Sequence, residues 1–484
     1  MPQRSSPPAR ASRPFTVVLV AAALALLFGG FASAAAAAAP ASQPAGGAKP
    51  NFLILVADDL GYADVGFTGG TAIPTPNLDR FAAGGVTFTD FRACPMCSPT
   101  RAGLMTGRWP GRFGMMRAVV PPWSDAGLPP DERTLPELLA AAGYERRGIF
   151  GKWHLGHARR AFLPLAHGFT EFVGCYNGAI DYLTHERDGE VDWHHNDRTV
   201  REDGYATDLI ATHAIMFIKD APAGAPWLAY VPFTAPHAPF QGKEEDRARF
   251  PQLKNPDRRN YAAMVVALDR AVGQVLAAAD ARPDAANTLV LFMSDNGGIP
   301  RVGSNAPYRG GKLGVYEGGT RVCAAARWPA GGLVGGKRFD GRVGYIDVLP
   351  TVLAAVGAKP AAGVDGLDFL PAVRGTAALP ERPWFSYIHQ DAGAHASVHL
   401  GRWKLVAHGD AFAEKPATAP TLELYDLSAD PTEATDVAAK HADVVARLHG
   451  LLREFGALQR PGVKAYGEGR EGFTPPKDWI ITKP

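Results

Sequence analysis

Polar residues that can do chemistry recur directly after the predicted strands of this chain. Short apolar runs bounded by polar or turn residues predict four strands, at residues 52–57, 147–150, 227–233 and 288–293. Seven polar side chains follow them: Asp58, Asp59, Lys152, His154, His237, Asp295 and Asn296. One such aspartate would usually cap a helix and one such histidine would usually be hydrogen-bonded, but seven together favour one shared site. In open α/β sheets, ligands bind beyond the carboxyl ends of the strands.

The oxygen-bearing members of this group indicate a hard metal ion. They are Asp58, Asp59, Asp295 and Asn296, whose carboxylate and amide oxygens suit calcium or magnesium better than zinc. Lys152 and His154 are two positions apart, so on extended backbone both side chains would point the same way and bring positive charge beside the metal. This combination predicts a site for an anionic, tetrahedral ester group, either sulfate or phosphate.

The chain has four cysteines, Cys94, Cys97, Cys175 and Cys323. The first two form C-x-x-C, which can be a disulfide, a redox pair or half a zinc site, but no second C-x-x-C completes such a zinc site. Pro99 suits the first turn of a helix and Gly107 suits its end, which places Cys97 at a helix N-terminus. Unpaired amides and the helix dipole favour an anion there. An unmodified, low-pKa thiolate nucleophile would use the same geometry.

The segment Cys97-Ser98-Pro99-Thr100-Arg101, followed by Thr106-Gly107, resembles the signature of the type I, formylglycine-dependent sulfatases of the alkaline phosphatase superfamily. Further motifs stand in register with that segment, at residues 58–59, 151–156, 236–237, 295–298 and 310–312. The resemblance covers roughly residues 50 to 360. Residues 260–269 and 305–322 look particularly like the arylsulfatase B (N-acetylgalactosamine-4-sulfatase) branch.

In the family that this segment resembles, the signature cysteine is oxidised to formylglycine by a formylglycine-generating or sulfatase-maturating enzyme, and the hydrated aldehyde attacks sulfur. The resemblance implies one Ca²⁺ held by Asp58, Asp59, Cys97 in its modified form, Asp295 and Asn296. Asp295 is also a plausible acceptor of the nucleophile's proton. Cys94 departs from what this chemistry needs, because a neighbouring thiol could pair with Cys97 and block its oxidation.

The resemblance also implies a set of catalytic residues, Cys97, Arg101, Lys152, His154, His237 and Lys312. The two lysines would face the sulfate, while Arg101 would steady the formylglycine. His237 would protonate the leaving alcohol. His154 would help to release the sulfate after the first displacement, which divides one hard step into two easier ones.

The expected substrate is a sulfate ester on a sulfated carbohydrate, or an aryl sulfate. Two alternatives stay open. One is hydrolysis of phosphonate or phosphate esters on the same scaffold. The other is a carbohydrate-binding protein in which Cys97 is never modified.

Composition excludes several classes of protein. The chain has 484 residues, of which 46% are hydrophobic and 20% charged, as in globular proteins rather than disordered ones. Its formal net charge is only +2, whereas a dedicated nucleic-acid binder would show a strongly basic domain. We therefore expect no nucleic-acid partner.

The N-terminus is typical of an export signal. Arg10 and Arg13 precede an apolar run at residues 15–31, and small residues after it, including Ala32-Ser33-Ala34, offer a cleavage site. The run is at the short limit for spanning a membrane. We predict a signal peptide and small-residue leader over 1–39, export to the periplasm or the outside, and no integral membrane segment after signal removal.

Strands that alternate with helices predict an α/β fold with a mostly parallel sheet flanked by helices, as in alkaline phosphatase. The capping box formed by Thr134 and Glu137 opens one of these helices, and apolar residues at helical spacing over 264–276 predict another. We predict a catalytic domain over 50–380 and a C-terminal subdomain over 381–484. The subdomain has predicted strands at residues 384–388, 397–400, 403–407 and 422–427 and a helix at 444–455.

Two groups of histidines invite a functional interpretation that the sequence does not favour. His389, His395 and His399 lie in the C-terminal subdomain, where we expect surface or structural roles rather than substrate contact. Residues 192–197 read Asp-Trp-His-His-Asn-Asp, which suggests a metal site. Because they fall in a long polar insertion, we predict a solvated loop instead, although Trp193 could stack on a sugar.

Overall fold

The computed structural model describes residues 47–359, 362–390 and 393–484. The chain from Ala41 to Pro484 forms one compact unit. The predicted signal peptide and leader, residues 1–39, lie outside the described residues. The predicted division at residue 380 stays a prediction, because both predicted parts fall within that one unit.

Four parallel strands form the centre of the main sheet, in the order β10-β1-β9-β3. They are β1 (Asn51–Ala57), β3 (Arg146–Lys152), β9 (Trp227–Pro232) and β10 (Thr288–Ser294). Every residue of β1, β9 and β10 is buried, which is why these strands appear in the sequence as continuous apolar runs. Ala57 pairs with Ser294, so the two strands end at the same level and Asp58 comes to lie beside Asp295.

The main sheet continues on both sides of this centre. One side adds β2 (Val86–Arg92), β11 (Arg321–Arg327), β12 (Lys337–Phe339) and β13 (Val343–Gly344), and the other adds β4 (Glu171–Cys175), β7 (His194–His195) and β8 (Arg198–Thr199). Strand β11 is antiparallel to both of its neighbours, and the β4–β7–β8 side is antiparallel beyond β4. The predicted mostly parallel sheet is therefore confirmed, with antiparallel strands toward its edges.

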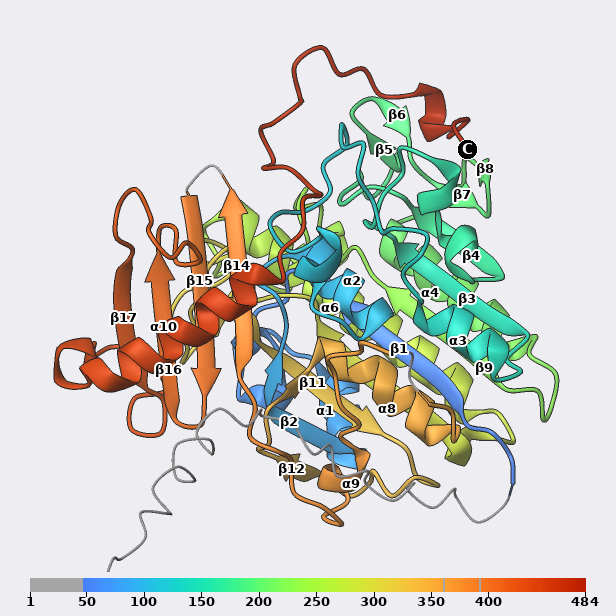
Figure 1. Ribbon diagram of the computed structural model, residues 1–484. Helices are drawn as coiled ribbons and strands as arrows, with labels where there is room; N and C mark the ends of the chain where they lie inside the picture. Colours follow the sequence, from blue (N-terminus) through green and yellow to red (C-terminus); the bar gives the residue numbers. More distant parts are fainter. Residues whose placement is uncertain (1–46, 360–361, 391–392) are drawn as a thin grey trace, which may run out of the picture. The chain divides into compact units, whose positions relative to one another are not determined.

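Helices cover both faces of the sheet (Figure 1). Phe52, Ile54 and Val56 of β1 share a core with α2 (Cys97–Thr106), α3 (Leu135–Ala141) and α8 (Val348–Ala355). Leu53, Leu55 and Ala57 share a second core with α1 (Pro76–Gly84), α4 (Ala206–Lys219) and α6 (Pro256–Asp280). Alternate side chains of one buried strand thus hold the two helical layers.

Helix α6 is long and apolar enough to cross a membrane by length and composition, which the sequence analysis did not identify. The protein buries 78% of its apolar window, so α6 is a core helix here. It is the one such helix among the described residues.

Shorter elements complete the main unit. A two-stranded hairpin consists of β5 (Glu186–Arg187) and β6 (Glu190–Val191), and short α-helices are α5 (Glu244–Arg247), α7 (Glu317–Thr320) and α9 (Leu370–Val373). The 3-10 turns are Tyr62–Asp64, Gly66–Thr68, Pro110–Phe113, Arg160–Phe162, Pro164–His167, Ala285–Asn287, Tyr345–Asp347, Ala438–Lys440 and Lys477–Trp479. The predicted capping box of Thr134 and Glu137 is present at the start of α3.

The C-terminal part forms a separate antiparallel sheet, as predicted. Its strands follow chain order, β14 (Trp384–Gln390), β15 (Gly393–Leu400), β16 (Trp403–His408) and β17 (Thr421–Asp426), and helix α10 (Ala442–Ala457) packs along it (Figure 1). Buried Leu448, Leu452 and Phe455 join α10 to the core that includes α2 and α3.

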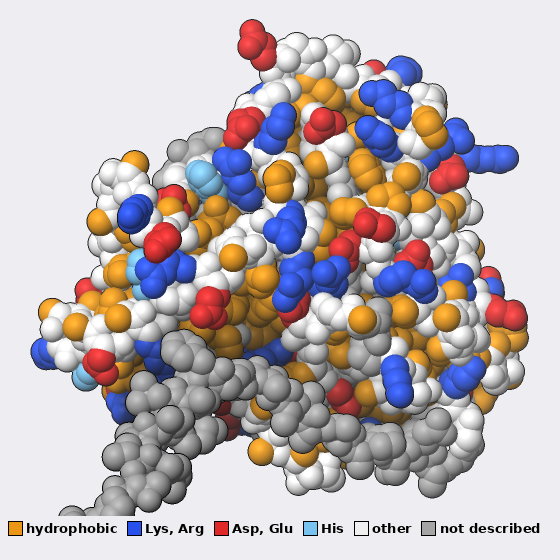
Figure 2. Space-filling view, viewed as in Figure 1, with side chains coloured by type: hydrophobic (Ala, Val, Ile, Leu, Met, Phe, Trp, Pro, Cys, Tyr) orange, Lys and Arg blue, Asp and Glu red, His pale blue; other side chains and the backbone are white. Residues whose placement is uncertain are grey.

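An ion network also ties the small sheet to the main one. The buried carboxylate of Glu317 accepts from Arg92 of β2 at 2.6 Å and from Lys404 of β16 at 2.9 Å. These two cations hold the pKa of Glu317 well below its usual range, although burial acts in the opposite direction. Around this frame, basic and acidic side chains are interspersed over the face shown in Figure 2.

Candidate active site

The ends of β1 and β10 bring together the oxygen-bearing residues predicted from the sequence. The backbone N–H of Asp59 donates to Asp295 Oδ1 at 3.2 Å, and Asn296 Nδ2 donates to Asp59 Oδ1 at 2.8 Å. These residues and Asp58 have no exposed surface. Within the described chain, Asn296 Oδ1 is buried and has no hydrogen-bond partner. An unpartnered amide oxygen beside three carboxylates fits a site for an oxygen-preferring cation.

The electrostatics of the acidic cluster point in the same direction. Burial and the neighbouring Asp295 raise the pKa of Asp58 to about 7. Ligand atoms of Asp58, Asp59, Cys97 and His237 all lie within 4.8 Å of one another, close enough for one ion. A bound cation would relieve the repulsion between the carboxylates. The membership of His237 in this group is new, because the sequence analysis gave it a role as an acid only.

Two lysines already compensate part of the negative charge. Lys152 Nζ lies 2.6 Å from Asp58 Oδ2, and Lys312 Nζ lies 2.8 Å from Asp59 Oδ2. Burial opposes the charged form of Asp59, but Lys312 and His237 outweigh it and lower the pKa of this carboxyl to about 2. Lys312 lines the pocket described below, whereas Lys152 is fully buried behind it.

Arg101 holds the cluster from below. Its Nη2 lies 2.7 Å from Asp295 Oδ2 and 3.7 Å from Asp58 Oδ2, while Nη1 donates to the carbonyl of Lys152 at 3.1 Å. Arg101 is buried in the fourth position after Cys97 on α2 and does not line the pocket. The structure therefore gives it a role in positioning Asp295 and the end of β3.

Cys97 is the first residue of α2, as predicted. The extended Met96 precedes it, and Gly107 ends the helix with φ of 67°, in the left-handed region that glycine adopts readily. Cys97 Sγ lies 3.4 Å from Asp58 Oδ1. Burial and the charge of Asp295 raise the pKa of the Cys97 thiol well above its ordinary value. This disfavours the alternative of an unmodified, low-pKa thiolate.

The expected interference from Cys94 has no counterpart in the structure. All four cysteines lie within the described residues and all are free. Cys94 Sγ instead donates to the hydroxyl of Tyr345 at 3.1 Å, on a different side of the segment from Asp58. Cys97 is thus available for modification.

The prediction that Lys152 and His154 point the same way is wrong. Strand β3 ends at Lys152, and His154 has φ of 57°, so the backbone between them is not extended. Lys152 reaches Asp58, whereas His154 Nε2 donates to the carbonyl of Val120 at 3.0 Å. Among the described residues the other ring nitrogen, Nδ1, has no partner, which leaves a buried lone pair.

His237 follows β9 and faces the acidic cluster. Its Nδ1 lies 2.6 Å from the carbonyl of Ala238, so Nδ1–H donates there, and Nε2 lies 3.6 Å from Asp59 Oδ2. Burial and then the charge of Lys312 lower the pKa of His237 to about 3. The imidazole is therefore neutral at pH 7 in the substrate-free protein.

These residues open onto a cavity of about 300 Å³. Four predicted catalytic residues line it, namely Cys97, His154, His237 and Lys312. Sequence analysis missed the rest of its wall, which consists of Val119, Val120, Pro122, Gly178, Ala179, Arg187, Leu313, Gln390 and Tyr466. The one signal available was the family resemblance, and these residues fall outside its motifs.

The histidine groups occupy other places. The prediction of a solvated loop over 192–197 is wrong for Asp192, Trp193 and His194, which are buried. Asp192 accepts from the backbone of Tyr176 and from His194, both at 2.9 Å, so it organises the start of the insertion. None of the three C-terminal histidines borders the cavity within the part of the chain that the structure describes.

Comparison with known proteins decides the family, because residues 50–358 match the family described as Sulfatase. The chain belongs to the sulfatase family. N-acetylgalactosamine-6-sulfatase of Canis lupus familiaris is 37% identical over 384 residues, which cover 73% of this chain and 71% of that protein. Arylsulfatase A of Bos taurus is 34% identical over 478 residues, covering 88% and 92%. The protein is a sulfuric ester hydrolase, and the narrower likeness to arylsulfatase B is corrected to this broader one.

Solved structures show the same fold. The crystal structure of Ps i-CgsB superimposes with a TM-score of 0.80 at 32% identity and covers 87% of this sulfatase and 95% of that chain. PsFucS1 sulfatase from Pseudoalteromonas sp. gives a TM-score of 0.68 at 24% identity, covering 85% and 90%. The central sheet, its flanking helices and the small C-terminal sheet therefore form the sulfatase architecture.

Gly178 gives a direct test of how closely the pocket wall positions His154. A Cβ at this position would lie 2.4 Å from His154 Nε2, the atom that donates to Val120. Gly178→Ala should displace the imidazole and lower kcat for an aryl sulfate by about 10-fold or more, since a 1 Å misplacement can cost that much. The assay is sulfate release, with the melting temperature measured in parallel.

The matched control for that variant is Gly450→Ala, because a Cβ there meets open space. This control should keep wild-type turnover. Wild-type turnover of a folded Gly178→Ala protein would show that the wall does not position His154.

Proposed function

We propose that this sulfatase hydrolyses sulfate esters on a sulfated sugar or glycan, using one Ca²⁺ and a formylglycine made from Cys97. The observation that carries the proposal is the placement of Cys97 at the start of α2, 3.4 Å from Asp58 in the buried acidic cluster. The printed names of relatives support the substrate class, among them N-acetylgalactosamine-6-sulfatase. So does the crystal structure of Ps i-CgsB in complex with k-i-k-neocarrahexaose.

The residues that would hold the ion are Asp58, Asp59, Asp295 and Asn296, together with the side chain made from Cys97. Their oxygens suit Ca²⁺, and the unpartnered Oδ1 of Asn296 gives the ion a neutral ligand. When bound, Ca²⁺ would polarise a sulfate oxygen, and the hydrated aldehyde would supply the oxygen nucleophile. The reaction consumes one water and gives an alcohol and inorganic sulfate.

The chain's own cations prepare the pocket for an anion. Lys312 faces the cavity and would bind a sulfate oxygen directly, because its charge remains after pairing with Asp59 at 2.8 Å. Lys152 and Arg101 act from behind the wall, where they keep Asp58 and Asp295 ionised and fixed. Groups preorganised in this way stabilise charge without reorganising during the reaction.

His237 would supply the proton that the leaving alcohol needs when the S–O bond breaks. In the empty pocket Lys312 helps to keep its pKa near 3, but an entering sulfate monoester brings negative charge and favours the imidazolium. His154 keeps Nε2–H on the carbonyl of Val120, so its free Nδ1 would take up a proton as sulfate is released.

Export and maturation follow from the same proposal. Residues 1–39 would direct the chain to the periplasm or the outside, where sulfated glycans are met. Cys97 is 1% exposed in the folded protein, so a formylglycine-generating or sulfatase-maturating enzyme would have to reach it before folding is complete.

The modification can be tested on protein purified from its own host. The peptide containing Cys97 should carry an aldehyde that mass spectrometry detects and a hydrazide probe captures. Cys97→Ala should still fold but lose turnover of sulfate esters. Cys94→Ser is the matched control, since a hydroxyl there can still contact Tyr345, and it should keep both aldehyde and activity. Full activity with an intact Cys97 thiol would refute the proposal, and preference for phosphate esters would redirect it.

The role of His237 predicts a difference between two substrates. A sugar alkoxide is a poor leaving group that needs a proton as the bond breaks, and a positioned acid contributes about 10²–10⁴-fold. Nitrophenyl sulfate leaves as a stabilised anion and needs that proton much less. His237→Ala should therefore reduce kcat/KM far more for a sulfated sugar than for nitrophenyl sulfate. An equal loss on the two would assign His237 to binding only, with Lys312 as the next candidate acid.

A further inference from the structure

One cation of the active-site wall has no part in the acidic cluster. Arg187 and Lys312 are the two lysine or arginine residues that line the cavity within the described chain. Lys312 pairs with buried Asp59, whereas the carboxylate beside Arg187 is that of Asp188, which is 41% exposed and 3.3 Å away. The charge of Arg187 is thus only weakly neutralised and faces the same cavity as Cys97.

Arg187 is held at the pocket by contacts on both its side chain and its backbone. Its Nη2 donates to the hydroxyl of Tyr466 at 3.3 Å, and Tyr466 also lines the cavity. Its backbone carbonyl accepts from Trp479 Nε1 at 3.0 Å. Tyr466 and Trp479 both belong to the C-terminal tail, residues 458–484, which returns to the main sheet after α10 (Figure 1).

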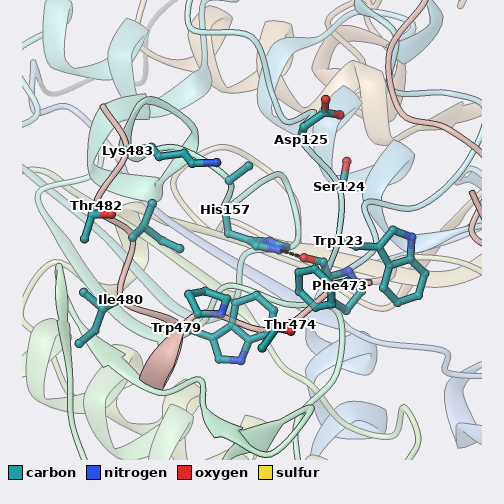
Figure 3. A pocket seen from close by; sticks show the side chains of 14 residues that line it. Trp123, Ser124, Asp125, His157, Phe473, Thr474, Trp479, Ile480, Thr482 and Lys483 are labelled. Atoms are coloured by element: carbon teal, nitrogen blue, oxygen red, sulfur yellow. Dashed lines mark hydrogen bonds between the residues drawn. The ribbon is translucent and has the colours of Figure 1, made fainter. Parts of the chain in front are cut away.

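The tail fixes the whole hairpin that carries Arg187. The backbone N–H of Asp478 donates to Glu190 of β6 at 2.9 Å, and Arg187 and Glu190 pair across the hairpin. The tail in turn is anchored in the pocket of Figure 3, where Trp479 packs edge-on against His157 at 5.2 Å between ring centres. Trp479 has no exposed surface. A tail this well packed would serve to position the pocket-facing residue of a short hairpin.

We propose that Arg187 binds a second anionic group of the substrate, so that this sulfatase prefers sugars carrying another sulfate or a carboxylate beside the scissile ester. The inference rests on the proposed function and specifies its substrate class as polyanionic glycans. A guanidinium forms paired, charge-assisted hydrogen bonds with either oxyanion, which makes arginine the suitable residue. The tail acts as the positioning element for Arg187.

The test compares three substrates on the mature enzyme. They are a monosulfated hexosamine, the same sugar with a second sulfate, and nitrophenyl sulfate, which has no second anion. The wild type should have a KM about 10-fold or more lower for the disulfated sugar, as expected for one charge-assisted contact. Arg187→Gln should reduce the ratio of the two kcat/KM values by the same factor. Raising the salt concentration should narrow the wild-type preference as well.

Two further variants separate recognition from general effects. Arg198→Gln removes an exposed positive charge from the same insertion and should leave the preference and the aryl sulfatase activity unchanged. Trp479→Phe removes the donor to the Arg187 carbonyl and should reduce the preference partly, in the direction of Arg187→Gln. Its ordered fold is checked by melting temperature.

The outcomes against the inference are distinct from those against the proposed function. Equal wild-type kcat/KM for the two sugars, or an equal loss on both in Arg187→Gln, would overturn the role of Arg187 and leave a glycan sulfatase. Hydrolysis of nitrophenyl sulfate without hydrolysis of either sugar would overturn the glycan substrate, and the inference with it.

Discussion

Three carboxylates buried at the ends of two neighbouring strands are the constraint around which this sulfatase is organised. At an effective dielectric constant of 20, two like charges 4 Å apart repel by about 4 kcal/mol. The register of β1 against β10 makes this proximity unavoidable, because Ala57 pairs with Ser294 and the acids follow directly. The fold must therefore supply positive charge at this edge, and the pKa of Asp58, raised to about 7, shows that its own cations do not fully suffice.

The surrounding backbone reflects the same constraint. Asp59, His154 and Leu313 have left-handed φ values of 66°, 57° and 67°, which are uncommon for residues other than glycine. Such conformations cost about 1–3 kcal/mol each and persist where other contacts determine them. Lys312 supplies one of these contacts through its ion pair with Asp59, and Val120 supplies another by accepting from His154. Strain at these positions keeps catalytic groups aimed at one point.

The sequence predicted the parts of the site that depend on strand ends. Continuous apolar runs identified β1 and β10, so Asp58 and Asp295 could be placed together without a structure. The directions of Lys152 and His154 could not, because the turn after β3 leaves the extended conformation. Arg187 and Tyr466 are 279 positions apart and meet only because the tail returns to the β5–β6 hairpin. Local patterns do not encode that contact.

Calcium binding tests the central claim most directly. We would measure the metal content of the purified enzyme, its turnover after chelation and the calcium affinity of Asp58→Asn, with the exposed Asp257→Asn as control. The account predicts one Ca²⁺ per chain, loss of turnover on chelation with recovery on adding Ca²⁺ rather than Zn²⁺, and weakened affinity only in Asp58→Asn. Full turnover by calcium-free enzyme would contradict it.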